Sequence, residues 1–132
     1  MNKVFLSLGS NKGQRFNYLK KTILNIKNIN FLRYIKASPV YETKPMYNLE
    51  QETFLNMVVQ LNTSISPIEL LEETQSIEIK MGRKATNLKN QPRVIDIDIL
   101  DYESVILNDK ELILPHPGIT ERLFVLKPWS DI

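Results

Sequence analysis

Two aspartates, Asp96 and Asp98, alternate with isoleucines in the strand-like stretch RVIDIDIL at residues 93–100, which begins with an arginine. Because side chains alternate between the two faces of a strand, Asp96 and Asp98 should share one face with Val94. The opposite, buried face should hold the isoleucines of the stretch, Ile95, Ile97 and Ile99. A half-buried strand with a solvated face would also alternate in this way, but aspartate is disfavoured in strands. The two carboxylates start roughly 6–7 Å apart at the backbone, and they repel each other unless a divalent cation lies between them.

A basic segment, residues 80–93, leads directly into this acidic strand. It contains no acidic residue and five cations: Lys80, Arg83, Lys84, Lys89 and Arg93. Arginine makes planar, bidentate contacts with phosphate oxygens, so Arg83 and Arg93 are candidate phosphate ligands. Carboxylates that hold Mg²⁺ beside cations that hold phosphate are typical of phosphoryl transfer, although a solvated surface loop could have the same composition. We expect residues 83–92 to form a lid that orders when bound phosphate groups neutralise its charge.

Composition limits the class of protein. The 132 residues are 42% hydrophobic and 24% charged, which predicts one globular domain over residues 1–132. Cysteine is absent and histidine occurs once, which argues against disulfides and zinc. The GSNKGQR stretch lacks the spacing and the Lys-Ser/Thr ending of a P-loop. The net charge of +2 is too small to indicate that the protein binds nucleic acid. No apolar run approaches the ~18 residues of a membrane span, and the N-terminal residues do not have the pattern of a signal peptide. We therefore expect a cytoplasmic protein that binds neither nucleic acid nor membrane. We further expect the chain to act as a monomer.

Hydrophobic periodicity predicts the order β-α-β-β-α-β, followed by a hairpin and a final helix. The first predicted strand lies within residues 3–11 and runs into a turn at Gly9, Ser10 and Asn11. The other predicted strands cover residues 31–43 with a break at Pro39, 54–64 and 93–100. The first helix covers about residues 14–28, with an apolar face of Phe16, Leu19, Ile23 and Ile26. The hairpin runs through residues 101–109, and a short strand and the last helix fall within 111–126.

The second helix carries clear start and stop signals. Ser66 is placed as its N-cap, Pro67 lies in the first turn, and Glu69 completes a capping box. The helix should run to about Met81 and stop at Gly82. The whole pattern is ferredoxin-like α+β, an antiparallel sheet with helices on one face, plus the added hairpin and C-terminal helix. The two aspartates would then lie on the open face of the sheet.

Several other side chains are ambiguous when taken alone. A single histidine between prolines, as in LPHPG, is more often a packed loop residue than a ligand. Core packing is the usual role of aromatic rings such as Tyr47, Phe54, Phe124 and Trp129. Asn11 and Asn56 suit turn capping as well as the binding of a polar ring.

Six stretches resemble, in order, the motif series of the 6-hydroxymethyl-7,8-dihydropterin pyrophosphokinases of folate biosynthesis. They are LSLGSN, SPVYETKP, FLNMVV, QSIEIKMGR, PRVIDIDIL and LPHPGITERLFVLKP. Together they span nearly the whole chain. The P-R-x-x-D-x-D block joined to the P-H…R-x-F-V-L block is the most specific part, whereas GSN alone would be weak.

The resemblance implies a ferredoxin-like enzyme that transfers pyrophosphate from ATP to the hydroxymethyl oxygen of the pterin and releases AMP. It implies that Asp96 and Asp98 hold two Mg²⁺ ions and that Arg83 and Arg93 act with them in catalysis. The residues implied to contact ATP are Leu71, Gln75, Glu78, Arg83, Arg93, Ile99, His116 and Arg122. Those implied to contact the pterin are Thr43, Met46, Phe54, Asn56, Asp96 and Phe124, with the two phenylalanine rings enclosing the heterocycle.

Two other functions stay open at this point. The topology also suits an RNA-binding module, although no strand carries the aromatic pattern that such modules use. Asn90 and Gln91 stand where the family usually has an aromatic residue and a glycine, and Ala85 stands where it often has arginine. An impaired homologue or an allosteric pterin sensor would fit these departures. Family members usually continue beyond KPWSDI, but the motifs precede that point, so we expect activity without the extra tail.

Overall fold

The computed structural model describes residues 1–44, 52–82, 94–119 and 122–132. In chain order its elements are β1 (Asn2–Ser10), α1 (Arg15–Lys27), β2 (Leu32–Ala37), β3 (Tyr41–Thr43), β4 (Phe54–Thr63), α2 (Pro67–Lys80), β5 (Asp96–Tyr102), β6 (Leu107–Asn108), β7 (Ile113–Leu114) and α3 (Leu123–Ser130). The segment expected to act as a lid, residues 83–92, lies outside the described residues.

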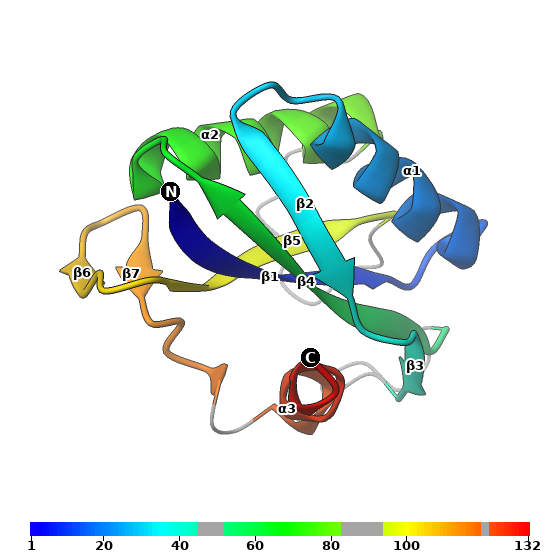
Figure 1. Ribbon diagram of the computed structural model, residues 1–132. Coiled ribbons are helices and arrows are strands. Elements are labelled where there is room, and N and C mark those ends of the chain that lie inside the picture. The colour runs from blue at the N-terminus through cyan, green and yellow to red at the C-terminus, as the bar shows by residue number, and fades with distance from the viewer. Residues whose placement is uncertain (45–51, 83–93, 120–121) are drawn as a thin grey trace.

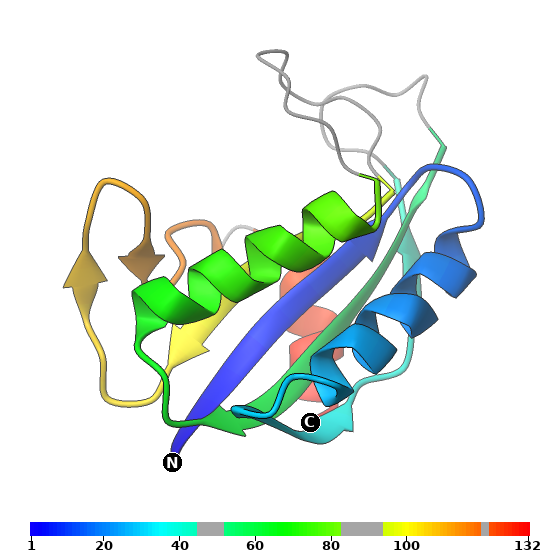
Figure 2. The same cartoon turned by 90° about the horizontal axis from the view of Figure 1, so that it is seen from above.

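An antiparallel sheet forms the centre of the fold. Its strands follow the order β2-β4-β1-β5, and β3 pairs with β4 beyond the end of β2. The two helices α1 and α2 lie side by side on one face of the sheet, whereas α3 lies on the other face (Figure 1, Figure 2). The predicted ferredoxin-like arrangement is confirmed. The added C-terminal helix α3 covers part of the sheet face that the β-α-β-β-α-β unit alone would leave open.

The main core lies between the sheet and the helices α1 and α2. The three isoleucines of the acidic stretch, Ile95, Ile97 and Ile99, are all buried in it, as predicted. Val94 also packs against this core, so the expectation that it shares a face with the aspartates was wrong. Val94 precedes β5, and strand alternation does not apply to it.

A second, smaller core lies under α3. Its buried members are Val58, Leu100 and Val125, and Phe5, Ile119, Phe124, Trp129 and Ile132 pack against them. The rings of Phe5 and Trp129 are 5.2 Å apart between centroids. None of the helices in the described part of the chain is long and apolar enough to cross a membrane.

The predicted limits of α2 are confirmed. The Ser66 hydroxyl accepts a hydrogen bond from the Glu69 N–H at 3.2 Å, and the Glu69 carboxylate accepts one from the Ser66 N–H at 3.4 Å. Pro67 is the first helical residue, where its missing N–H leaves no bond unmade. Gly82 follows the last turn with φ of 103°, a value that favours glycine.

The buried stripe of α1 differs from the predicted one. Leu19 and Ile26 are buried as expected, and Thr22 is buried with them because its hydroxyl donates to the Tyr18 carbonyl at 2.8 Å. Phe16, however, is 52% exposed, so its assignment to the core face was wrong. Burial along α1 begins one turn later, at Leu19, and the Phe16 ring contacts a lysine ammonium on the helix surface instead.

The hairpin exists, but its strands are not the predicted ones. The chain leaves β5 through a turn in which Ser104 has φ of 62°, and β6 then pairs with β7 in a separate two-stranded sheet. Asp109 makes the turn between them: its N–H donates to the Leu112 carbonyl and its carboxylate accepts the Glu111 N–H, both at 3.0 Å. An aspartate that bonds to the backbone two residues later is a turn signal, and it was overlooked in the sequence.

Candidate active site

Two cross-strand rows gather polar residues on the side of the sheet that α3 partly covers, called the α3 face below. In the first row Gly9 of β1 lies between Asn56 of β4 and Asp96 of β5. In the next row Ser7 of β1 pairs with Asp98. Both aspartates are half-buried, and they lie on the face opposite the three isoleucines, as the alternation predicts. The acid pair and the asparagine therefore occupy neighbouring positions on one face.

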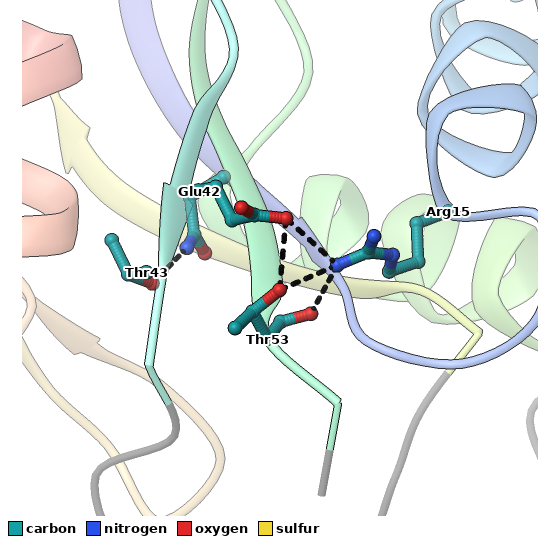
Figure 3. Close-up of polar contacts among 5 residues, drawn as sticks. Arg15, Glu42, Thr43 and Thr53 are labelled. Atoms are coloured by element: carbon teal, nitrogen blue, oxygen red, sulfur yellow. Dashed lines mark hydrogen bonds and ion pairs between the residues drawn. The ribbon is translucent and has the colours of Figure 1, made fainter.

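Three of the residues expected to contact the pterin meet on this face. Asn56 is buried, and its carboxamide Nδ2 donates to the Thr43 Oγ1 at 2.8 Å (Figure 3). Thr43 is also the register partner of Phe54, which is half-buried. A Cβ on Gly9 would lie 3.0 Å from the Asn56 Oδ1, so glycine leaves the space that this side chain needs. Met46, the fourth expected residue of this part of the chain, lies outside the described residues.

Glu78 connects α2 to the acidic strand. Its side chain is buried, and its Oε2 accepts the backbone N–H of Ile97 at 2.9 Å. Ile97 stands between Asp96 and Asp98, so this bond fixes the backbone that carries both carboxylates. The family resemblance implies a place near the nucleotide for Glu78, and the structure adds a bond to the strand itself.

Leu71 and Gln75 stand on α2 at the helical spacing that leads to Glu78. Leu71 packs against the main core, whereas Gln75 is exposed. Ile99 is buried in the main core on the face opposite Asp98, so any contact that it makes with a nucleotide would use its backbone. β5 is the last strand in the sheet order, so one of its edges is not paired with another strand of that sheet.

His116 is held by its backbone and by its ring. Its N–H donates to the Leu100 carbonyl at 2.9 Å, and its Nδ1 accepts the Gly118 N–H at 3.0 Å. Burial lowers the pKa of His116 below the usual 6.5, the charge of Arg122 lowers it further, and the charge of Asp96 opposes them. The ring is therefore neutral at pH 7, with its proton on Nε2, and it lies close enough to Asp96 and Arg122 to sense both charges.

Arg122 and Phe124 lie at the start of α3. The Arg122 guanidinium carbon is 5.8 Å from the centroid of the Phe124 ring, and Phe124 is half-buried against the second core. A Cβ on Gly118 would come within 2.8 Å of the Arg122 Nε, so glycine lets the guanidinium lie against the backbone near His116. The structure thus brings one cation and one aromatic ring of the expected set to the α3 side.

Arg83 and Arg93, the candidate phosphate ligands of the basic segment, lie outside the described residues. Sequence reasoning missed Ser7, and its prediction of a turn at Gly9 and Ser10 was wrong, because β1 continues to Ser10. Ser7 and Gly9 line the same face as the aspartates. The alternation of leucines with small residues in FLSLGS could have identified them, because small residues in a strand often mark a close approach of other groups.

The two aspartates, Asp96 and Asp98, suit a magnesium ion that is also bound by substrate. They do not suit a metal ion whose ligands all come from the protein. Among the described residues no group of three or more His, Cys, Asp or Glu side chains could hold a metal ion. Magnesium commonly binds through one or two carboxylates plus substrate phosphates and water. The half-buried pair Asp96 and Asp98 fits that pattern.

Comparison with known sequences identifies the family. The sequence model of the family described as 7,8-dihydro-6-hydroxymethylpterin-pyrophosphokinase (HPPK) matches residues 5–132. The chain belongs to this family. The resemblance seen in the motifs is therefore confirmed, and the match to the HPPK family extends over nearly the whole chain.

Individual relatives support the same assignment. The chain is 45% identical over 128 residues to the folic acid synthesis protein fol1 of Schizosaccharomyces pombe, covering 96% of this chain but 17% of that protein. It is 40% identical over 131 residues to the 2-amino-4-hydroxy-6-hydroxymethyldihydropteridine pyrophosphokinase of Bacillus subtilis, covering 99% of this chain and 78% of that one. The crystal structure of Plasmodium falciparum HPPK-DHPS with pteroate superposes with a TM-score of 0.75 at 18% identity, over 98% of this chain and 38% of that one, which shows a shared fold.

Proposed function

We propose that this chain transfers the pyrophosphoryl group of ATP to the hydroxymethyl oxygen of 6-hydroxymethyl-7,8-dihydropterin, which yields the pterin diphosphate and AMP. The observation that carries the proposal is the row Asn56–Gly9–Asp96 on the α3 face. It sets a buried carboxamide, suited to the polar edge of a heterocycle, beside a carboxylate suited to a metal-bound triphosphate. Only a glycine separates them.

The pterin would lie over Asn56. Because the Thr43 hydroxyl accepts a hydrogen bond from Asn56, its own proton is directed elsewhere and can be donated to the ligand. The bond also fixes the Asn56 carboxamide, whose oxygen can accept from a ring N–H. Phe54 and Phe124 would enclose the flat ring, since aromatic faces suit a heterocycle, and Met46 would complete the pocket by family resemblance.

The triphosphate would lie over Asp96 and Asp98, which would hold two Mg²⁺ ions. Bound Mg²⁺ would neutralise charge on the phosphate oxygens and make the pterin hydroxyl more acidic. The neutral His116 would donate its Nε2 proton to a phosphate oxygen, because Gly118 occupies its Nδ1. Arg122 would add a positive charge from the side of α3, and Arg83 and Arg93 would add theirs from the basic segment. Asp96 lies between the proposed pterin position and the proposed triphosphate position. It would therefore help to align the pterin oxygen with the phosphorus.

The nucleoside part of ATP would lie along the outer edge of β5. The Ile97 N–H points away from β1, toward Glu78, and strand alternation directs the backbone of Ile99 the same way. Leu71 and Gln75, on the helix that carries Glu78, would contact this part of the ligand by family resemblance. We also propose that the chain acts as a monomer.

Replacing Asp96 or Asp98 with asparagine tests the metal assignment, because it removes charge and keeps volume. Each variant should lose Mg²⁺-dependent AMP release while its unfolding transition persists. Asp101→Asn on the same strand is the matched control and should keep its activity. Near-normal turnover of Asp96→Asn and Asp98→Asn would contradict the assignment. Binding of pterin and an ATP analogue by the wild type without turnover would indicate the sensor function instead.

A further inference from the structure

Arg15 occupies a position that the helix itself disfavours. It is the first residue of α1, where the helix dipole repels a positive charge, and the first turn of α1 contains no acidic residue. Gln14, the N-cap, makes no side-chain capping bond. Contacts outside the helix must therefore explain the place of the Arg15 side chain.

Those contacts form a closed set of three residues from separate parts of the chain. Arg15 Nη1 donates to the Thr53 backbone carbonyl and to the Thr53 hydroxyl, both at 2.7 Å, and pairs with Glu42 Oε2 at 3.3 Å. The Thr53 hydroxyl in turn donates to the same Glu42 oxygen at 2.9 Å. Figure 3 shows Arg15 reaching from the start of α1 to both partners. Within the set, the Arg15 guanidinium donates, the Glu42 carboxylate accepts, and the Thr53 hydroxyl both accepts and donates.

The set holds the two strand ends that carry part of the pterin site. Glu42 is the central residue of β3, next to Thr43, and Thr53 immediately precedes Phe54. Thr43 and Phe54 are register partners. Because β3 has only three residues and, within the sheet, pairs only with β4, side-chain bonds near this pair add to the few contacts that hold the two strands together.

An exposed ion pair alone would carry little weight, since such pairs contribute weakly. Here the arginine also bonds to a backbone carbonyl and a hydroxyl, which fixes its direction, and its side chain is only 27% exposed. We propose that Arg15 is a positioning residue for the pterin: through Thr53 and Glu42 it sets the spacing of Phe54 and Thr43, and thereby the Thr43–Asn56 bond. The inference rests on the proposed function.

The test compares Arg15→Gln with Arg33→Gln, which changes an exposed arginine on the neighbouring strand β2. Calorimetry would give the dissociation constants of the pterin, with an ATP analogue and Mg²⁺ present, and of the ATP analogue alone. Arg15→Gln should weaken pterin binding about tenfold, because side chains that are no longer held in place must be ordered when the pterin binds, whereas ATP binding should change less than about twofold. Arg15→Lys, which keeps a charged donor nitrogen but changes its reach, should give an intermediate loss. Arg33→Gln should bind both ligands like the wild type.

Thr53→Val provides a second, independent variant, because it keeps the β-branched shape and removes the hydroxyl. Its loss of pterin affinity should not add to that of Arg15→Gln in the double variant. Unchanged pterin affinity in Arg15→Gln, or equal losses for pterin and ATP, would overturn the inference while the proposed function stands. A wild-type chain that binds no pterin would overturn both.

Discussion

The bond between Glu78 and the acidic strand can be tested by two substitutions of the same residue. Glu78→Ala removes the acceptor of the Ile97 N–H, which is buried between α2 and β5 at 2.9 Å from the carboxylate. A buried hydrogen bond to a charged group contributes about 1.5–3 kcal/mol, so we expect a loss of that size in the free energy of unfolding. Glu78→Gln keeps an acceptor and removes a negative charge near two aspartates, so its loss should be below about 1 kcal/mol.

Urea unfolding in Mg²⁺-free buffer measures both values, with Glu72→Ala as the matched control. Glu72 is exposed on the same helix, and its replacement should change the free energy of unfolding by less than about 0.5 kcal/mol. AMP release should fall further in Glu78→Ala than in Glu78→Gln, because the freed strand no longer holds its carboxylates in place. Equal stability of Glu78→Ala and Glu72→Ala would refute the structural role given to this bond.

Three further predictions address single features. The carbon NMR signal of His116, the only histidine, should titrate with a midpoint below pH 6.5. Because the pKa of His116 is lower in the folded protein, the neutral ring stabilises the fold above pH 6.5, and this contribution is lost as the pH falls through the folded pKa. A midpoint at or above 6.5 would contradict the burial of its ring. Ser66→Ala should lower the free energy of unfolding by about 1 kcal/mol, whereas the exposed Ser64→Ala should not; equal effects in urea would argue against the capping box. Gly9→Ala places a Cβ against Asn56 and should weaken pterin binding more than ATP binding in calorimetry; unchanged pterin affinity would count against the proposed pterin position.

Features set by neighbouring residues could be predicted from the sequence. The capping box of α2 needs only Ser66 and Glu69, and both of its bonds are found. The alternation of aspartates and isoleucines in β5 likewise needs only the strand period, and it assigned both faces correctly. The motif series identified the family because it samples many positions at once.

Features that depend on a distant partner could not be predicted in this way. Tyr102 should share the face of the aspartates by simple alternation, but it is buried in the main core. The register with β1 shifts by one residue beside Leu100, because Ile99 pairs with Leu6 and Asp101 pairs with Phe5. Such a bulge is visible only when both strands are known.

The Arg15 contacts have the same character. They span 27 residues to Glu42 and 38 residues to Thr53, and helix propensity alone gives no reason for an arginine at that position. The position of α3 across the sheet depends on the second core, which joins β4, β5 and the last turns of the described chain.

The identity of the nucleotide product tests the central proposal most directly. Wild-type protein would be incubated with ATP, Mg²⁺ and 6-hydroxymethyl-7,8-dihydropterin, and the products separated and identified by mass spectrometry. We predict AMP and the pterin diphosphate in equal amounts, with neither formed when the pterin or Mg²⁺ is left out. Formation of ADP with a pterin monophosphate, or release of AMP without a pterin diphosphate, would contradict pyrophosphoryl transfer by this chain.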